Sequence, residues 1–260
     1  MKKFSNEDFR QVLEAVNIYP GDMVFVHSSL FQLGRLESCE TEAMPVELVR
    51  LMLDYLGNEG TLAVPTFSFG FAKGIPFDRQ ITSSEGMGIF SESVRKLPAS
   101  LRSYHPLQSI AAVGRLAEAI TSPDTGSAFD IDGSFDVMIG LGAKLLLLGA
   151  PIQAASLIHY AEERVEVPYR YWKMFTGIYV DNGEEKERTY KFFARDLELD
   201  PRLNLYPIET WLTERNQFHK VPLGNGYVAQ CAFSDFIEVV MQHLNDDPYC
   251  LVKSIKKDPG

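Results

Sequence analysis

The hydrophobic positions along the chain predict helices that alternate with short strands. After a cap at Ser5, the residues Phe9, Val12, Leu13 and Val16 recur at helical spacing. Short runs rich in branched apolar residues, which are typical of buried strands, lie between this helix and later ones. The further predicted helices cover residues 43–56, 89–96, 116–121, 156–164 and 234–244, and the predicted strands cover 23–27, 61–65, 109–113 and 144–148.

Two segments depart from this alternation. Residues 67–88 are rich in Gly, Ser and aromatic residues without a clean period, which predicts a long loop that is either functional or disordered. Residues 177–179 and 189–195 flank the turn Asp181-Asn182-Gly183, which predicts a β-hairpin. The pattern as a whole predicts a mixed α/β (α+β) fold, with a central sheet flanked by helices in a single domain over residues 1–260.

Composition narrows the class of partner. Lys and Arg number 25 and Asp and Glu number 35, so the net charge of −10 disfavours nucleic acid. Cys39, Cys231 and Cys250 form no CxxC pair, so no metal site is indicated. Because no apolar core follows the N-terminal lysines and the longest apolar run is short, we expect a cytoplasmic protein without membrane contact. The sequence also lacks GxxxxGK[ST], GxGxxG, GxSxG and HExxH motifs.

Two histidines occupy suggestive positions outside the predicted helices. His27 ends a strand and precedes Ser28 and Ser29, whose backbone N–H groups can face an anion or a carbonyl. The alternative is a turn in which one of these serines caps the next helix. His105 is held in an extended conformation by Pro106, and it lies either at the rim of a cleft or in a loop where it bonds to backbone.

A third histidine lies in a predicted helix beside two acids. His159, Glu162 and Glu163 share one helix face at positions i, i+3 and i+4. A carboxylate there can accept from one ring nitrogen, which fixes the tautomer and leaves the other nitrogen as a base. The alternative is a surface ion pair. Because the helix follows an apolar strand and a Gly-Ala-Pro loop, a common location of α/β sites, the catalytic interpretation gains weight.

Six short motifs occur in a fixed order between residues 24 and 170, and together they resemble the aminoglycoside 3-N-acetyltransferase family, also called the antibiotic N-acetyltransferases. Each motif alone is weak, so the resemblance depends on their order and spacing. They are Val26-His27-Ser28-Ser29-Leu30, Glu59-Gly60-Thr61-Leu62, Pro65-Thr66-Phe67, Gly86-Met87-Gly88, Arg102-Ser103-Tyr104-His105-Pro106 with Ser109, and Leu147-Leu148-Gly149 with His159-Tyr160-Ala161-Glu162.

The resemblance implies a mixed α/β fold, acetyl-CoA as the acetyl donor, and a primary amine on a sugar-like ring as the acceptor. It also implies a general base at His159, supported by the acid Glu162, and direct transfer without a metal. The cofactor would meet Ser28, Ser29 and Leu30 through its pantetheine and thioester. By resemblance, Ser109 and His105 line the same cleft, with Ser109 assigned to the cofactor and His105 to the substrate. We also expect Glu163, Arg170 and Tyr171 to bind the substrate.

Four stretches distinguish this chain from the antibiotic-modifying members. Where those enzymes often carry an acid after the second strand, this chain has the aromatic segment 67–71, and the aspartate-rich turn is altered at 77–84. The basic and aromatic segment 167–173 suits a nucleotide diphosphate, or else forms a hairpin with ordinary cross-strand pairs. The second carboxylate of the family falls near residues 190–193, where this chain has no acid, and Asp196 is a candidate substitute.

These departures favour an acetyl-CoA-dependent N-acetyltransferase for an amino sugar that is nucleotide-linked, as in relatives from polysaccharide pathways. The first alternative is an aminoglycoside 3-N-acetyltransferase that confers antibiotic resistance. The second, from another class, is a non-catalytic protein that binds coenzyme A or a sugar nucleotide. The partners expected are therefore the amino sugar and coenzyme A, and the sequence leaves a homo-oligomer open.

Overall fold

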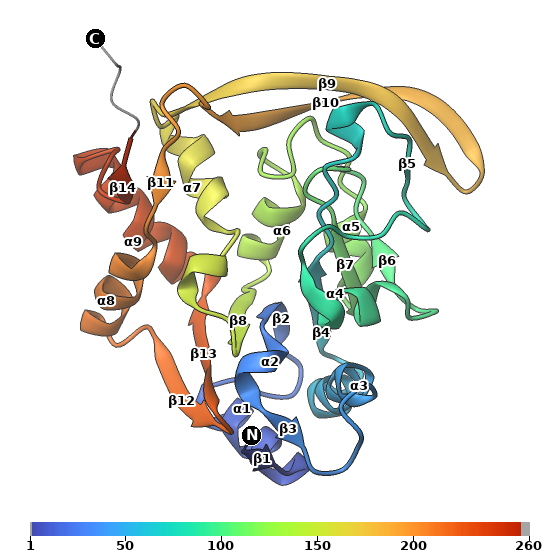
Figure 1. The fold of residues 1–260 in the computed structure, drawn as a ribbon, viewed down its shortest axis with the longest axis vertical. Helices are drawn as coiled ribbons and strands as arrows, with labels where there is room; N and C mark the ends of the chain where they lie inside the picture. The colour runs from blue at the N-terminus through green and yellow to red at the C-terminus, as the bar shows by residue number, and fades with distance from the viewer. Residues whose placement is uncertain (1, 256–260) are drawn as a thin grey trace.

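The computed structural model describes residues 2–255, which are built around a seven-stranded mixed sheet (Figure 1). The strand order is β12-β13-β8-β2-β4-β7-β6, in which β2 is parallel to both β4 and β8 and the other neighbours are antiparallel. The carboxyl ends of β8, β2 and β4 therefore lie side by side. The bounds are β2 Met23–Ser28, β4 Thr61–Pro65, β6 Leu101–Arg102, β7 Ile110–Gly114, β8 Lys144–Leu148, β12 His219–Leu223 and β13 Gly226–Ala232.

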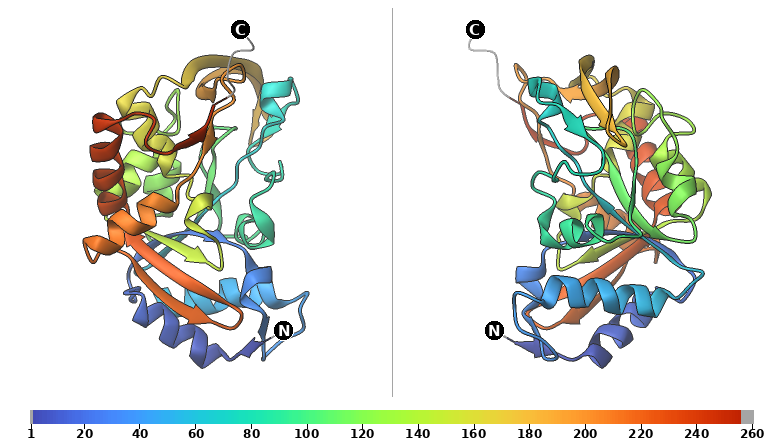
Figure 2. Two further views of the ribbon diagram at one scale, coloured as in Figure 1. Left: turned by 60° about the vertical axis from the view of Figure 1, so that its left-hand side comes forward. Right: turned by 90° about the vertical axis from the view of Figure 1, so that its right-hand side faces the viewer.

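The central strands are buried on both faces, which explains their continuous apolar sequences. In β2, Phe25 packs into one core whereas Val24 and Val26 pack into a second core, because alternate side chains point to opposite faces. Figure 2 shows α1 and α3 in blue and α9 in red on opposite sides of the sheet. The first core is covered by α5 (Ala117–Thr121), α6 (Ser134–Gly140), α7 (Ile158–Val165) and α9 (Phe233–Asp246), and the second by α1 (Asn6–Ala15), α3 (Met44–Leu56) and α4 (Gly88–Arg95).

The mixed α/β fold class predicted from the sequence is confirmed, and each predicted helix and strand is present with small shifts at its ends. Ser5 caps α1 as expected, through a reciprocal capping box with Asp8. None of the helices within residues 2–255 is both long and apolar enough to cross a membrane. The pattern missed α2 (Leu30–Leu33), α6, α8 (Tyr206–Glu214), β12 and β13, and the short elements β1 (Lys3–Phe4), β3 (Arg35–Leu36), β5 (Phe77–Asp78), β11 (Arg202–Leu203), β14 (Val252–Ser254), η1 (Phe71–Lys73) and η2 (Ile152–Ala154).

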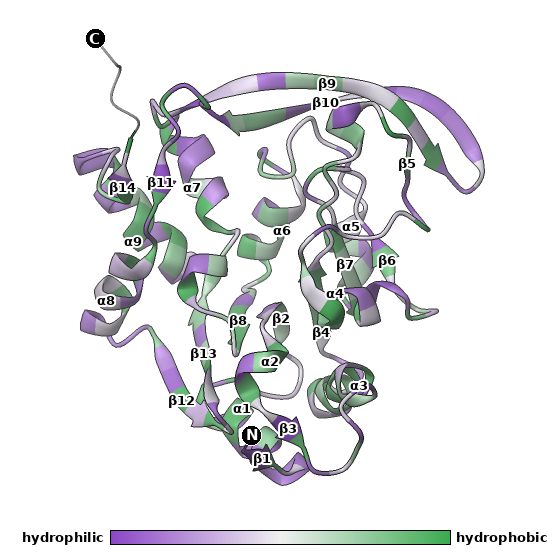
Figure 3. Ribbon diagram, viewed as in Figure 1, coloured by the Kyte–Doolittle hydropathy of each residue, from purple (hydrophilic) through white to green (hydrophobic). Residues whose placement is uncertain are grey.

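The β-hairpin is much longer than the sequence pattern predicts. Strands β9 (Arg170–Asp181) and β10 (Glu184–Arg195) each have 12 residues and pair antiparallel along their full length. The hairpin arches across one end of the molecule, from the neighbourhood of α7 to that of β5 (Figure 1). Its tip is hydrophilic, as the purple colour in Figure 3 shows, so no hydrophobic alternation marked residues 184–188 as a strand.

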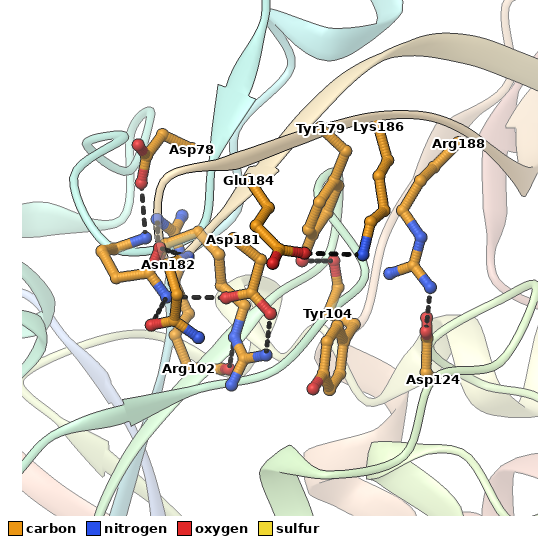
Figure 4. Close-up of polar contacts among 12 residues, drawn as sticks. Asp78, Arg102, Tyr104, Asp124, Tyr179, Asp181, Asn182, Glu184, Lys186 and Arg188 are labelled. Carbon is orange, nitrogen blue, oxygen red and sulfur yellow. Dashed lines mark hydrogen bonds and ion pairs between the residues drawn. The ribbon is translucent and has the colours of Figure 1, made fainter.

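Polar contacts attach the far half of the hairpin to the loops beneath it (Figure 4). The Tyr179 hydroxyl donates to the Tyr104 carbonyl across 2.9 Å, and Arg188 forms an ion pair with Asp124. Arg79 lies 3.2 Å from Asp181 near the turn. These contacts hold the far half of the hairpin. At the other end, its first residue, Arg170, lies beside α7.

Candidate active site

A cavity of about 450 Å³ opens at the edge where β2, β4 and the loop after β8 meet. This edge of an α/β sheet, beyond the carboxyl ends of parallel strands, is where ligands commonly bind. The long loop before α4 and the loop before α7 close its sides. The described residues that line it are His27, Ser28, Pro65, Phe67, Phe69, Gly86, Met87, Gln153, Ala154, Ala155, Ser156, Ile158, His159, Leu203 and Leu205.

A close backbone approach brings the loop after β2 to the loop that leads into α7. Gly149 follows β8 with φ of 70°, a conformation that favours glycine. A Cβ at this position would lie 2.6 Å from the Ser29 carbonyl oxygen. The two loops can therefore approach this closely only because residue 149 has no side chain. Their contact sets the spacing of the two cavity walls.

His27 is a buried, neutral wall residue. Its Nε2 atom lies 3.3 Å from the Ser156 backbone N–H, which donates to it, and 3.1 Å from the Ser156 hydroxyl. Burial lowers the pKa of His27 to about 4, with a further contribution from the nearby His159. Because Nε2 accepts, the remaining ring proton is on Nδ1, and His27 joins β2 to the start of α7.

His159 and Glu162 adopt the arrangement predicted from their spacing on α7. The Nδ1 atom of His159 lies 2.6 Å from Oε2 of Glu162, so Nδ1–H donates to the carboxylate and Nε2 is left as an acceptor. The His159 side chain is 29% exposed and lines the cavity, whereas Glu162 is fully buried. This geometry leaves Nε2 of His159 able to accept a proton at the cavity wall, with a buried carboxylate on the opposite side of the ring.

Arg170 reaches the same carboxylate from the first position of β9. Its Nε lies 2.9 Å from Oε2 of Glu162, and its Nη1 donates to the Phe193 carbonyl across 3.1 Å. Although burial alone raises the pKa of Glu162, the charge of Arg170 and the hydrogen bond from His159 outweigh it and lower that pKa. The contacts of Arg170 are therefore with His159 and Glu162, and its predicted contact with substrate stays a prediction.

The loop after β2 lies partly on the cavity wall. Ser28 lines the cavity, but the Ser29 N–H donates to the Leu148 carbonyl across 2.9 Å. Ser29 occupies the N-cap position of α2, and its side chain makes no capping hydrogen bond. Leu30 is the first residue of α2, where the helix offers its N–H no acceptor, and the residues that line the cavity do not include it.

His105 and Ser109 are structural in their contacts, and the described cavity wall does not include them. His105 donates to the Lys191 carbonyl and accepts from the Gln108 N–H, each at 3.1 Å. These contacts match the second interpretation of His105, a loop residue that bonds to backbone. Burial lowers its pKa to about 4. Ser109 is fully buried and donates to the Thr66 carbonyl across 2.7 Å. Both residues hold loops in place around the site.

Three other candidates also lie away from the described cavity wall. Glu163 points to Ser127, whose hydroxyl lies 2.9 Å from both carboxyl oxygens. Tyr171 is 46% exposed near the base of the hairpin. Asp196, the candidate second carboxylate, accepts from the N–H groups of Glu198 and Leu199 and so closes a local turn. Their predicted roles stay predictions, and the residues that line the cavity beside His159 do not include them.

One acidic residue at the rim was missed by the sequence analysis. Oε1 of Glu85 accepts from the N–H groups of Phe69 and Gly70, at 2.8 and 2.9 Å, and lies 3.2 Å from the Ser68 hydroxyl. Glu85 is exposed and directly precedes Gly86, which lines the cavity. The fold thus returns a carboxylate to the aromatic rim that looked uncharged in sequence. Within residues 2–255, no group of three His, Cys, Asp or Glu side chains is placed to hold a metal ion.

Comparison with known proteins identifies the family. The sequence matches the family model described as aminoglycoside 3-N-acetyltransferase over residues 25–245. It is 28% identical over 225 residues to aminoglycoside N(3)-acetyltransferase III of Salmonella sp., covering 76% of this chain and 73% of that protein. A second Salmonella sp. protein of the same name aligns over 187 residues, and this alignment covers 61% of that protein's length. The present chain is also 27% identical to aminoglycoside N(3)-acetyltransferase IV of Salmonella sp., and the alignment covers 90% of this chain and 84% of that protein.

Solved structures share the fold. The apoenzyme of aminoglycoside acetyltransferase AAC(3)-IVa superposes with a TM-score of 0.79 at 23% identity, covering 99% of this chain and 93% of that one. AAC-IIIb in binary complex with CoASH gives 0.80 at 20% identity, covering 94% and 97%. Since the family model spans most of the chain, the protein belongs to the aminoglycoside 3-N-acetyltransferase family, which confirms the family and the acyltransferase class that the motifs predicted.

Proposed function

We propose that this protein transfers the acetyl group of acetyl-CoA to a primary amine of an aminoglycoside. The observation that carries the proposal is the His159–Glu162 pair, in which Nδ1 is held by a buried carboxylate and Nε2 remains an acceptor at the cavity wall. Family membership supports the reaction class, and the names of the relatives support the acceptor. The non-catalytic alternative is disfavoured because the base and its acid are both present in working geometry.

His159 acts as the general base. An ammonium group has no free electron pair, so it must lose a proton before its nitrogen can attack. Nε2 of His159 takes that proton, while Nδ1–H stays bonded to Glu162, whose charge stabilises the imidazolium. General-base assistance of this kind contributes roughly 10²–10⁴-fold to the rate.

The cavity residues fit acetyl-CoA, which supplies an electrophilic thioester carbonyl and so allows direct transfer. Ala154, Ala155 and Gly86 leave room for a slender chain, and Leu203 adds an apolar wall. We assign the Leu30 N–H, two residues after Ser28 of the cavity wall, as the donor to the carbonyl oxygen as negative charge develops on it. The loss of one such donor typically costs about 10²–10³-fold.

Two observations favour an aminoglycoside over a nucleotide-linked sugar as acceptor. Glu85 places a carboxylate at the rim, which suits a polycation. Arg170, the residue expected to bind a diphosphate, is 9% exposed and engaged with Glu162 and the Phe193 carbonyl. The relatives and structures named above carry aminoglycoside names, and one solved structure in this family is AAC-VIa bound to sisomicin.

A substrate panel tests the proposal. Purified protein is incubated with acetyl-CoA and either aminoglycosides or nucleotide-linked amino sugars, and free thiol is measured. We expect release with at least one aminoglycoside and none with the nucleotide-linked sugars. Release only with nucleotide-linked sugars overturns the acceptor, and no release with any amine, despite measured coenzyme A binding, supports the non-catalytic alternative.

A second experiment tests the base. His159→Ala is expected to abolish turnover while coenzyme A binding, measured by calorimetry, survives. Tyr249→Phe, an exposed change away from the cavity, is the control for general effects of mutation. Near-normal turnover of His159→Ala would refute the assignment of the base.

A further inference from the structure

The buried carboxylate of Glu162 has a second oxygen and a second neighbour that the base mechanism does not use. Oε2 faces Nδ1 of His159 and Nε of Arg170, whereas the buried Oε1 makes no hydrogen bond to any of the described residues. We propose that Tyr169 and Arg170 are positioning residues that hold Glu162 ionised and oriented toward His159. This inference rests on the proposed function, because it assigns the two residues to support of the same base.

Arg170 acts on the base through its charge. Its Nη2 lies 3.2 Å from Nδ1 of His159, but Nδ1 already gives its proton to Glu162, so the contact is electrostatic. Glu162 and Arg170 together carry no net charge. Arg170 therefore places a cation beside the ring, and its charge opposes a second positive charge there.

We assign Tyr169 as the donor for this unpaired oxygen. Its side chain is 1% exposed, and its hydroxyl makes no hydrogen bond to the described residues, just as Oε1 of Glu162 makes none. Burial and then the charge of Glu162 raise the pKa of the Tyr169 hydroxyl, so the hydroxyl keeps its proton. A small shift that lets this hydroxyl donate to Oε1 would satisfy two buried groups at once, each of which is costly to leave unpaired.

The groups that face His159 are few. Glu162 shares its helix, Arg170 approaches from β9, and His27 approaches from β2. His27 is neutral well below pH 7, because burial lowers its pKa to about 4. The ring of Phe129 covers another side at 6.0 Å between centroids. Among the described residues, the charged groups within contact of the His159 ring are therefore Glu162 and Arg170.

Histidine ring NMR without substrate tests the proposal. Protein labelled with ¹⁵N-histidine is titrated, and His159→Gln assigns the signal. In wild type we expect His159 as the Nδ1–H tautomer. In Arg170→Gln its titration midpoint is expected to rise by about one pH unit or more, since a cation beside the ring is removed. In Tyr169→Phe we expect the Nδ1–H signal to broaden or shift as the carboxylate loses a donor.

Kinetics give a second readout. Arg170→Gln is expected to lose about tenfold in kcat at pH 7 for each pH unit by which that midpoint rises above 7, and to recover at higher pH. For Tyr169→Phe we expect a drop in kcat of roughly tenfold. The KM for acetyl-CoA is expected to stay unchanged in both. Arg170→Lys keeps the charge and is expected to hold the midpoint near wild type.

Matched controls separate positioning from folding. Arg195→Gln removes an arginine paired with residue 170 in the hairpin register, and Tyr249→Phe alters a ring packed 5.7 Å from that of Tyr169. Both are expected to match wild type. An unchanged His159 titration in folded Arg170→Gln and Tyr169→Phe, or equal shifts in the controls, overturns the inference. Because the NMR uses no substrate, absence of thiol release from wild type would refute the proposed function while leaving this test intact.

Discussion

The carboxylate of Glu85 accepts the backbone N–H of Phe69 across 2.8 Å, and this bond folds the long loop back on itself. The loop carries Phe67, Phe69, Gly86 and Met87 to the cavity, so its closure shapes one wall of the site. The bond uses Oε1, and the other oxygen of this exposed carboxylate remains free to attract a cation at the rim.

Glu85→Gln is expected to raise the KM of a polycationic aminoglycoside roughly threefold to tenfold, because a solvated charge pair at about 4 Å is worth about 1 kcal/mol. The amide keeps an acceptor for the loop, so kcat is expected to stay near wild type. The difference should vanish in about 1 M salt, where charges are screened within about 3 Å. Glu187→Gln, an exposed change on β10, is the control. An equal KM for Glu85→Gln and wild type at low salt would contradict the role.

Glu162→Gln is expected to lower kcat by about 10²–10⁴-fold, because the amide cannot stabilise the imidazolium and can force the wrong tautomer. The KM for acetyl-CoA should change little, since the fully buried side chain lies behind His159. Steady-state kinetics at saturating aminoglycoside measure the effect. A kcat within a factor of three of wild type would show that the acid does not support the base.

The parts of the site that depend on local spacing were predictable from sequence. His159 and Glu162 are three residues apart on one helix, and helical geometry alone places them together. Strands β2, β4 and β8 were visible because both faces of the sheet are buried, so their sequences are continuously apolar. The fold class followed from the same alternation.

The parts that depend on long-range contacts were not predictable from a local pattern. Glu85 meets Phe69 from 16 residues away, and the order of the loop between them carries no periodic signal. His105 lies on a motif but bonds to the Lys191 carbonyl, 86 residues later. The hairpin was underestimated because its outer half is held by pairing and by contacts such as Tyr179 to Tyr104, without a hydrophobic face.

Glu163 makes stability depend on pH. Burial, and then the charge of Asp130, raises its pKa to about 7, against opposing effects of Ser127, Lys191 and Arg164. A carboxyl group whose folded pKa exceeds its unfolded value binds more protons in the folded state. Its stabilising contribution is therefore fully present below about pH 4.5, the ordinary value, and is lost as pH rises through about 7.

Glu163→Gln removes this pH-dependent loss. The free energy of unfolding of this variant relative to wild type is expected to rise between pH 5 and pH 8, by an amount on the order of 3 kcal/mol. Its Tm relative to wild type is expected to rise over the same range. Thermal unfolding at several pH values measures it. Glu214→Gln, an exposed change at the end of α8, should give a constant difference. A constant difference for Glu163→Gln as well would contradict the pKa direction.

Arg102 is expected to be the main clamp on the long loop. Its buried guanidinium donates to the carbonyls of Thr66 and Thr82, at 2.7 and 2.5 Å, and to the Ser109 hydroxyl at 3.0 Å. Burial, with the nearby charge of Arg95, lowers its pKa to about 10, so it remains charged at neutral pH. Thr66 and Thr82 lie toward opposite ends of the loop, and one side chain therefore ties both to the sheet.

Arg102→Met removes the donor to the Thr82 carbonyl and one of the two donors to the Thr66 carbonyl, which Ser109 still reaches, at about 1–3 kcal/mol for each group left unpaired. The free energy of unfolding is expected to fall by about 3 kcal/mol, and hydrogen exchange in residues 67–88 should accelerate. Arg115→Met, which removes an exposed arginine 3.2 Å from Glu59, should cost less than about 1 kcal/mol. Denaturant unfolding and exchange mass spectrometry measure both. If the two variants lose equal stability and the loop exchanges as in wild type, Arg102 does not hold the loop, and the cavity wall must owe its shape to Glu85 and the aromatic packing alone.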